Sequence, residues 1–151
     1  MRAAFYKSTR PGIAGLYNRL VRWWSGSQYS HVELVFSDGY SASASWMDGG
    51  VRFKRIDYMA AHWDFVDLPA DLEAGARAWF RKHDHKPYDI LGNVGFVWRP
   101  IRGKEGAFFC SEACAAALGI PEPWRFDPGT LSLILSYLHR NEAELVASQK
   151  T

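Results

Sequence analysis

The chain has 151 residues, of which 48% are hydrophobic and 23% are charged, and its formal net charge is +2. This length and composition predict one globular domain spanning residues 1–151 and exclude a disordered or collagen-like chain. The basic residues are too dispersed to form a nucleic-acid-binding stripe, so no nucleic-acid partner is expected.

The first half of the chain predicts a strand, a helix and an antiparallel meander. Residues 2–6 form a short apolar run, and apolar residues then recur at helical spacing over 13–24, up to a stop at Ser25-Gly26. From residue 31 the period changes to two. This change predicts strands over 31–36, 40–45, 51–56 and 63–68, joined by glycine-containing turns.

The second half predicts mostly helices. Asp71 is placed to cap a helix that ends in the basic run 81–83, and Pro87 prevents its continuation. The segment CSEACAAAL (110–118) predicts a short helix ended by Gly119, and an apolar stripe over 131–138 predicts a last helix. The fold class is therefore α+β, with an antiparallel sheet.

Cys110 and Cys114 lie one helical turn apart with diverging side chains, which disfavours a disulfide. Two reduced thiols favour a reducing compartment. No signal-peptide segment opens the chain, and no apolar run approaches the roughly 18 residues of a membrane span. These features predict a cytoplasmic protein without an integral membrane segment.

Cys110 is the strongest candidate for chemistry because it opens the 110–118 helix, where unsatisfied backbone N–H groups favour a thiolate. An imidazole that shares its proton would activate the sulfur further. His31 is the partner we favour, since it opens a predicted strand on the face opposite Val32 and Leu34. The alternative interpretations are a small buried cysteine and a surface histidine.

His83 and His85 form an HxH pair in a polar helix end that lacks further convincing ligands, so we interpret it as a solvated turn. No metal and no cofactor are expected. Among the seven tryptophans, Trp24 and Trp79 lie on apolar helical stripes and are predicted to be core. Trp46 and Trp98 lie in loops, where they could line a substrate groove or fold back on the core.

Four segments, covering roughly residues 13–120, together resemble the circularly permuted NlpC/P60 (papain-like) cysteine hydrolases, in particular the YiiX-like group. They are LVRWWSGSQYSHVELVFSDG, DGGVRFKRI, KPYDILG and FFCSEACAAAL. As in that group, the histidine segment precedes the cysteine helix. The resemblance implies a papain-like core in which the cysteine helix packs against the antiparallel sheet and His31 faces Cys110.

The resemblance further implies that Cys110 is the nucleophile and that His31 is the general base and later the general acid. The family's third polar residue usually follows the DG turn, often as Glu, and here that place falls near Ser43. Glu33 is our first choice instead, because it lies two residues from His31 on the same strand face, with Ser43 as the alternative and Asp48 as a weaker one. Tyr88 matches the family's tyrosine segment and is a candidate substrate-binding residue.

These expectations describe a cysteine peptidase or amidase that cleaves an amide or ester bond through an acyl-enzyme. The substrate would be a peptide of the peptidoglycan type, an isopeptide-like bond or a lipid acyl group, and the sequence does not choose among them. Two alternatives stay open. One is a non-catalytic binding domain with a degenerate cleft, and the other is a thiol acyltransferase that acts on lipid acyl groups.

Overall fold

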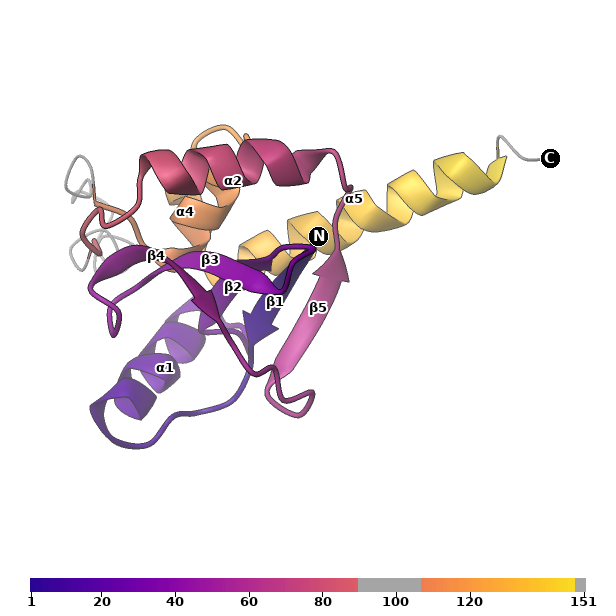
Figure 1. Ribbon diagram of the computed structural model, residues 1–151. Coiled ribbons are helices and arrows are strands. Elements are labelled where there is room, and N and C mark those ends of the chain that lie inside the picture. The colour runs from indigo at the N-terminus through magenta and orange to yellow at the C-terminus, as the bar shows by residue number, and fades with distance from the viewer. Residues whose placement is uncertain (90–106, 149–151) are drawn as a thin grey trace.

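The computed structural model describes residues 1–89 and 107–148 and shows an α+β fold (Figure 1). Its elements in chain order are β1 (Arg2–Tyr6), α1 (Gly12–Ser25), β2 (His31–Val35), β3 (Tyr40–Ser45), β4 (Gly50–Arg55), β5 (Trp63–Asp67), α2 (Leu72–Lys82), α4 (Cys110–Ala117), the 3-10 helix η1 (Pro123–Arg125) and α5 (Pro128–Ser148). The predicted element types are confirmed. The last helix is longer than the 131–138 stripe indicated.

The sheet has five strands in the order β4-β3-β2-β1-β5, and all neighbours are antiparallel. The predicted meander is therefore correct for β2, β3 and β4 but wrong for β5, which pairs with β1 instead of β4. The N-terminal strand enters between β2 and β5. Ala3, Ala4 and Phe5 are fully buried there, as is expected for a strand that is paired along both edges.

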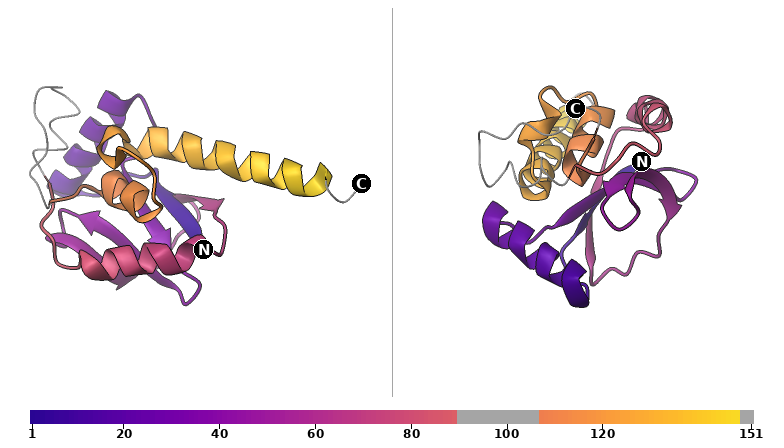
Figure 2. Two further views of the ribbon diagram at one scale, coloured as in Figure 1. Left: turned by 90° about the horizontal axis from the view of Figure 1, so that it is seen from above. Right: turned by 90° about the vertical axis from the view of Figure 1, so that its left-hand side faces the viewer.

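Three helices gather against the sheet. α4 packs against β2 and β3, α2 packs against α4 and β4, and α5 packs against α4 and β5 (Figures 1 and 2). The small side chains of α4 permit this close approach: Ala113, Cys114 and Ala115 have no exposed surface. The core between α4 and the sheet includes Val32 and Leu34, on the β2 face that their alternation predicts.

α1 lies apart from these three helices (Figure 2). It spans the predicted residues and ends at Gly26 in the left-handed conformation. Its apolar stripe, however, faces solvent. The prediction that Trp24 is core is wrong, since 46% of the residue is exposed, whereas Trp79 is half-buried against the core.

The segment after α2 connects the sheet to the start of α4. Val51 donates a hydrogen bond to the Lys86 carbonyl (2.9 Å), and Phe108 donates one to the Pro87 carbonyl (3.1 Å). Gly50 allows the close approach, because a Cβ atom at this position would lie 2.0 Å from the Lys86 carbonyl oxygen. Residues 107–109, and therefore the N-terminus of α4, are held beside β4 in this way.

Among residues 1–89 and 107–148, none of the helices combines the length and the apolar character that crossing a bilayer requires.

Candidate active site

Cys110 is the first residue of α4, and the chain enters the helix through an extended Phe109. The residue is 4% exposed. Its position in the first turn places it among backbone N–H groups that have no partner within the helix, where negative charge is favoured. Cys114 lies one turn further on, and both cysteines are free thiols, as predicted.

His31 is the first residue of β2 and pairs with Tyr6 of β1. Its Nε2 lies 2.7 Å from Oε1 of Glu33, two residues along the same strand. A carboxylate only accepts hydrogen bonds, so the proton lies on Nε2 and Nδ1 is left to face another group. An edge contact with the Trp63 ring, at 6.5 Å between centroids, supports the imidazole from the side.

The other partner of the His31 ring is Cys110. Burial by itself would lower the pKa of His31, but the charge of Cys110 and a hydrogen bond to it, together with Glu33, raise this pKa from 6.5 to about 9. Since Nε2 is engaged by Glu33, Nδ1 is the nitrogen available to the sulfur. The structure therefore brings Cys110, His31 and Glu33 together as a connected Cys-His-Glu set.

Glu33 is held by Arg52 as well as by His31. Arg52 of β4 donates two hydrogen bonds to it, from Nη1 to Oε2 at 2.7 Å and from Nη2 to Oε1 at 2.6 Å. Burial opposes ionisation of Glu33, whose side chain is 1% exposed, but the hydrogen bonds from Arg52 and His31 lower its pKa to about 2. The carboxyl group is therefore ionised at neutral pH.

The network continues outward from Arg52. Its Nε lies 2.9 Å from Asp48 Oδ2, and Lys54 lies 2.9 Å from the other carboxylate oxygen. Burial opposes ionisation of Asp48, but these two cations lower its pKa to about 2. Asp48, considered from the sequence as an orienting residue for His31, thus acts on Arg52 instead.

Ser43, the alternative to Glu33, donates a 2.7 Å hydrogen bond to the Val32 carbonyl and is fully buried. The geometry consequently places Glu33, and not Ser43, against the imidazole. Cys114 also lies near the Val32 carbonyl, at 3.8 Å. Burial raises the pKa of Cys114 well above its usual range, so this second thiol stays protonated.

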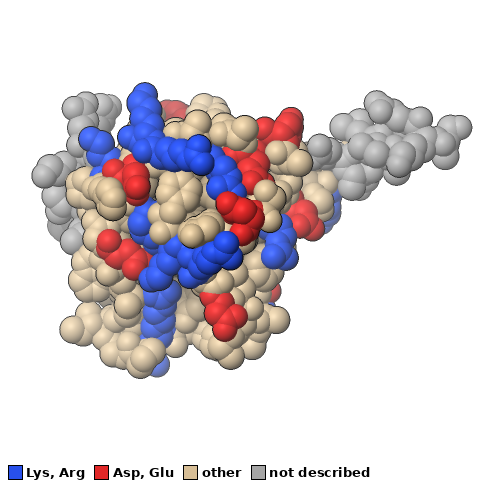
Figure 3. Space-filling model, viewed as in Figure 1, with Lys and Arg blue, Asp and Glu red and all other residues tan. Residues whose placement is uncertain are grey.

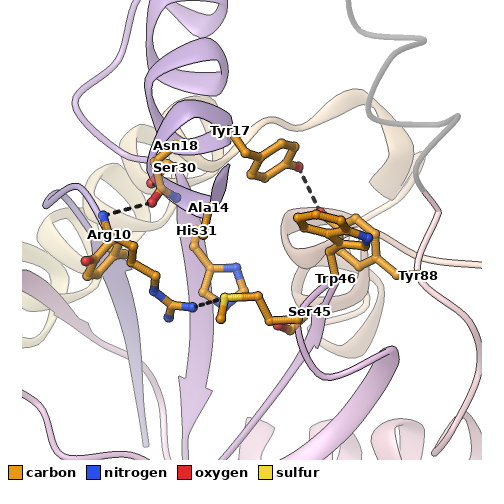
Figure 4. A pocket seen from close by; sticks show the side chains of 11 residues that line it. Arg10, Ala14, Tyr17, Asn18, Ser30, His31, Ser45, Trp46 and Tyr88 are labelled. Carbon is orange, nitrogen blue, oxygen red and sulfur yellow. Dashed lines mark hydrogen bonds between the residues drawn. The ribbon is translucent and has the colours of Figure 1, made fainter. Parts of the chain in front are cut away.

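His31 also forms part of a pocket between α1 and the turn after β3 (Figure 4). The walls include two residues expected to bind substrate, Trp46 and Tyr88. The Tyr88 hydroxyl lies 3.0 Å from that of Tyr17 on α1. Trp98, the third candidate, lies outside the described residues.

The sequence pattern did not identify two contributors to this site, Arg52 and Tyr17. Arg52 alternates with the core residues Val51 and Phe53, and its cross-strand partner is Ser43. Its alternation alone indicates only an outward-facing residue. Contact with Glu33 follows from the strand register, which depends on how β2, β3 and β4 align.

Glu112, part of the CSE segment, accepts a 3.4 Å hydrogen bond from the backbone N–H of Phe109 and so closes the first turn of α4. Burial, together with the nearby charge of Asp89, raises the pKa of Glu112 to about 7 even though this hydrogen bond lowers it. The carboxyl group supports the helix start that carries Cys110.

The HxH pair does not converge. The His83 ring stacks on Trp79, and its Nδ1 lies 2.8 Å from the Trp79 carbonyl oxygen, while the side chain of His85 is 90% exposed. Across the part of the chain that the structure describes, no group of three His, Cys, Asp or Glu side chains is arranged to hold a metal ion.

The coupled pair of His31 and Glu33 predicts how stability depends on pH. Glu33 has a lowered pKa, so its contribution to the free energy of unfolding is present above about 4.5 and is lost as pH falls towards about 2. His31 has a raised pKa, so its contribution is complete below 6.5 and is lost as pH rises through about 9. The stability that this pair contributes is therefore greatest between about pH 4.5 and pH 6.5.

Urea unfolding at a series of pH values checks this expectation. In His31→Gln the alkaline decline should be smaller than in the wild-type protein, while the acid decline remains. A wild-type protein and a His31→Gln variant with the same alkaline decline would show that the imidazole is not held as a cation in the folded state.

Comparison of the chain with protein-family models, with curated proteins and with solved structures found no match.

Proposed function

We propose that the protein is a cysteine hydrolase that cleaves an amide or ester bond through an acyl-enzyme on Cys110. The observation that carries the proposal is the Cys-His-Glu set: a cysteine at a helix N-terminus interacts with an imidazole whose other nitrogen lies 2.7 Å from a buried carboxylate. This is the arrangement that activates a nucleophile through an oriented base.

In the proposed reaction, the Cys110 thiolate attacks the carbonyl carbon of the substrate, and the negative charge moves to the carbonyl oxygen. We assign the backbone N–H of Cys110 as the donor to that oxygen. His31, protonated at rest, gives its proton to the departing amine or alcohol as the bond to it breaks, which leaves a thioester. Water then attacks the thioester carbonyl, and His31 takes up a proton from this water. The bond to sulfur breaks, which releases the acid product and restores the Cys110 thiolate.

Glu33 has a positioning role in this scheme. Its contact with Nε2 keeps Nδ1 directed at the sulfur, and its negative charge stabilises the imidazolium. Arg52 in turn holds Glu33 by two hydrogen bonds, so the carboxylate cannot rotate away. We propose that the substrate reaches the pair through the pocket at His31, with Trp46 and Tyr88 as substrate-binding residues.

The packing of α4 on β2 and β3, with the histidine strand preceding the cysteine helix, supports a papain-like permuted core. The substrate classes that the family resemblance implies are a peptide of the peptidoglycan type, an isopeptide-like bond and a lipid acyl group. Two free thiols fit a reducing compartment, and we accordingly propose a cytoplasmic location.

Intact-mass spectrometry with p-nitrophenyl acetate tests the acyl-enzyme. We expect one acetyl adduct per chain, which peptide mapping assigns to Cys110. Cys114→Ala is the matched control and should keep the adduct, because Cys114 is fully buried and protonated, while Cys110→Ala should lose it.

The fate of the adduct separates the related functions. Clearance by water supports a hydrolase, whereas clearance only on addition of an amine or alcohol indicates an acyltransferase. Failure of the wild-type protein to form an adduct on Cys110 would contradict both and favour a binding domain that retains the pocket.

A further inference from the structure

The outward face of α1 is apolar, which is unusual for a helix on the surface of a globular protein. Ile13, Leu16, Leu20 and Trp23 recur at helical spacing, and their exposed fractions are 76%, 60%, 54% and 77%. Residues at this spacing share one side of a helix. α1 thus presents a continuous stripe of large apolar side chains to solvent.

The inward face of α1 is small and polar. A Cβ atom on Gly15 would lie 1.9 Å from the Arg10 carbonyl oxygen, so the helix backbone is tightly seated here. Asn18, which is buried, donates to the Ser30 hydroxyl at 3.0 Å. Arg22 donates to the Lys7 carbonyl at 2.7 Å.

These contacts anchor α1 through its polar side, so its orientation is opposite to that of an ordinary amphipathic surface helix. The apolar side cannot turn inward without breaking the contacts of Asn18 and Arg22. The exposed stripe is therefore a built feature of the fold, and contiguous exposed apolar side chains of this kind mark a binding surface.

The charge at the edge of the stripe favours an anionic surface. Residues 1–32 contain no Asp or Glu, and α1 itself carries only basic charges, Arg19 and Arg22, of which Arg22 is turned inward. Arg19 is exposed at the edge of the stripe, beside Leu16 and Trp23 in helical projection. Figure 3 shows the lower-left part of the molecule, over α1, in tan and blue.

The aromatic end of the stripe favours a lipid surface over a protein partner. Trp23 and Trp24 lie side by side, with ring centroids 6.1 Å apart, at the C-terminal end of the helix. Trp rings concentrate at the boundary between headgroups and acyl chains, where an apolar ring and a polar N–H are both accommodated. A basic helix with such a face lies in the plane of that boundary.

We infer that the outward face of α1 docks onto the surface of a bilayer that contains anionic lipid. The docking surface consists of Ile13, Leu16, Leu20 and Trp23, with Arg19 at its edge. α1 also contributes Ala14 and Tyr17 to the pocket that contains His31. Docking would bring this pocket to the lipid surface, whatever reaction it performs, so the inference does not depend on the proposed hydrolase.

Co-sedimentation with vesicles tests the inference. We expect the full chain to bind vesicles of phosphatidylcholine and phosphatidylglycerol, and to bind vesicles of phosphatidylcholine alone more weakly. Added salt should weaken the binding. The double variant Leu16→Ser/Leu20→Ser should lose affinity by at least about tenfold, because two half-exposed leucines no longer enter the apolar layer.

Leu133→Ser/Leu138→Ser on α5 is the matched control, since those leucines are 74% and 52% exposed. This control should bind as the wild-type protein does, and thermal unfolding should show that both double variants are folded. The inference would be overturned if both double variants lost vesicle binding equally, or if the folded wild-type protein did not bind vesicles. Self-association abolished by Leu16→Ser/Leu20→Ser, without vesicle binding, would assign the face to a second copy of the chain and overturn it too.

Discussion

Replacing His31 by alanine is expected to slow acylation of Cys110 at neutral pH by roughly 10²–10⁴-fold, the range that a general acid–base group contributes. Two losses combine in this variant. The sulfur loses the imidazole that shares its proton, and a poor leaving group such as an amine also loses its proton donor. The rate of p-nitrophenol release, together with the mass of the Cys110 adduct, measures the effect.

His62→Ala is the control for this prediction. His62 lies in the turn before β5, with its ring 6.3 Å from that of Tyr6. Its replacement should leave the acylation rate within about twofold, since general acid–base effects require a group within hydrogen-bond reach. If His31→Ala and His62→Ala acylate Cys110 equally fast, His31 is not the base and the proposed Cys-His mechanism is wrong.

The second large effect concerns stability. Glu33→Gln is expected to reduce the free energy of unfolding by up to about 3–5 kcal/mol, the range for breaking a buried ion pair, because Arg52 then keeps only Asp48 as a charged partner. The charge in question is that of Arg52, whose side chain is 12% exposed, and a neutral amide cannot accept both of its hydrogen bonds as a carboxylate does. Urea unfolding at neutral pH measures the loss.

Glu122→Gln provides the matched control because Glu122 pairs with Arg125 at 3.0 Å on the surface, where the side chains are 52% and 64% exposed. An exposed pair contributes about 0–1 kcal/mol, so this variant should unfold almost as the wild-type protein does. Glu33→Gln/Arg52→Met should recover part of the stability, because the buried cation that lost the Glu33 carboxylate is removed as well. Equal stability of Glu33→Gln and Glu122→Gln would contradict a buried ion pair at Glu33.

The double variant also separates stability from positioning. With Arg52 replaced, the fold no longer contains a buried cation that has lost the Glu33 carboxylate, but the imidazole still lacks that carboxylate. We therefore expect acylation of Cys110 to stay slow in Glu33→Gln/Arg52→Met even where stability is recovered. Recovery of both properties together would indicate that Glu33 serves the fold alone.

Local sequence patterns predicted most elements of the fold. The change of period at residue 31 marks the start of β2 at His31, and the alanine-rich segment after Phe109 marks α4. Such signals are local, because side-chain spacing and helix stops act within a few residues. The same local spacing placed His31 and Glu33 on one strand face, and the structure brings them to 2.7 Å.

Local spacing does not specify how distant segments pair. The insertion of β1 between β2 and β5 depends on which strand edges are covered, and a short apolar run such as residues 2–6 does not specify its partners. The hydrogen bonds from Arg52 to Glu33 also depend on the pairing of distant strands. It joins β4 to β2 across β3, so it exists only once the register of three strands is set.

The sequence alone determined the class of the fold, the strand carrying His31 and the helix that Cys110 opens, because these follow from periodicities and helix boundaries within single segments. The tertiary structure decided which polar groups are in contact: Glu33 contacts His31, and Arg52 donates hydrogen bonds to Glu33. It also decided the orientation of α1. An amphipathic pattern specifies that a helix has two unlike faces, but only the contacts of Asn18 and Arg22 determine that the polar face turns inward.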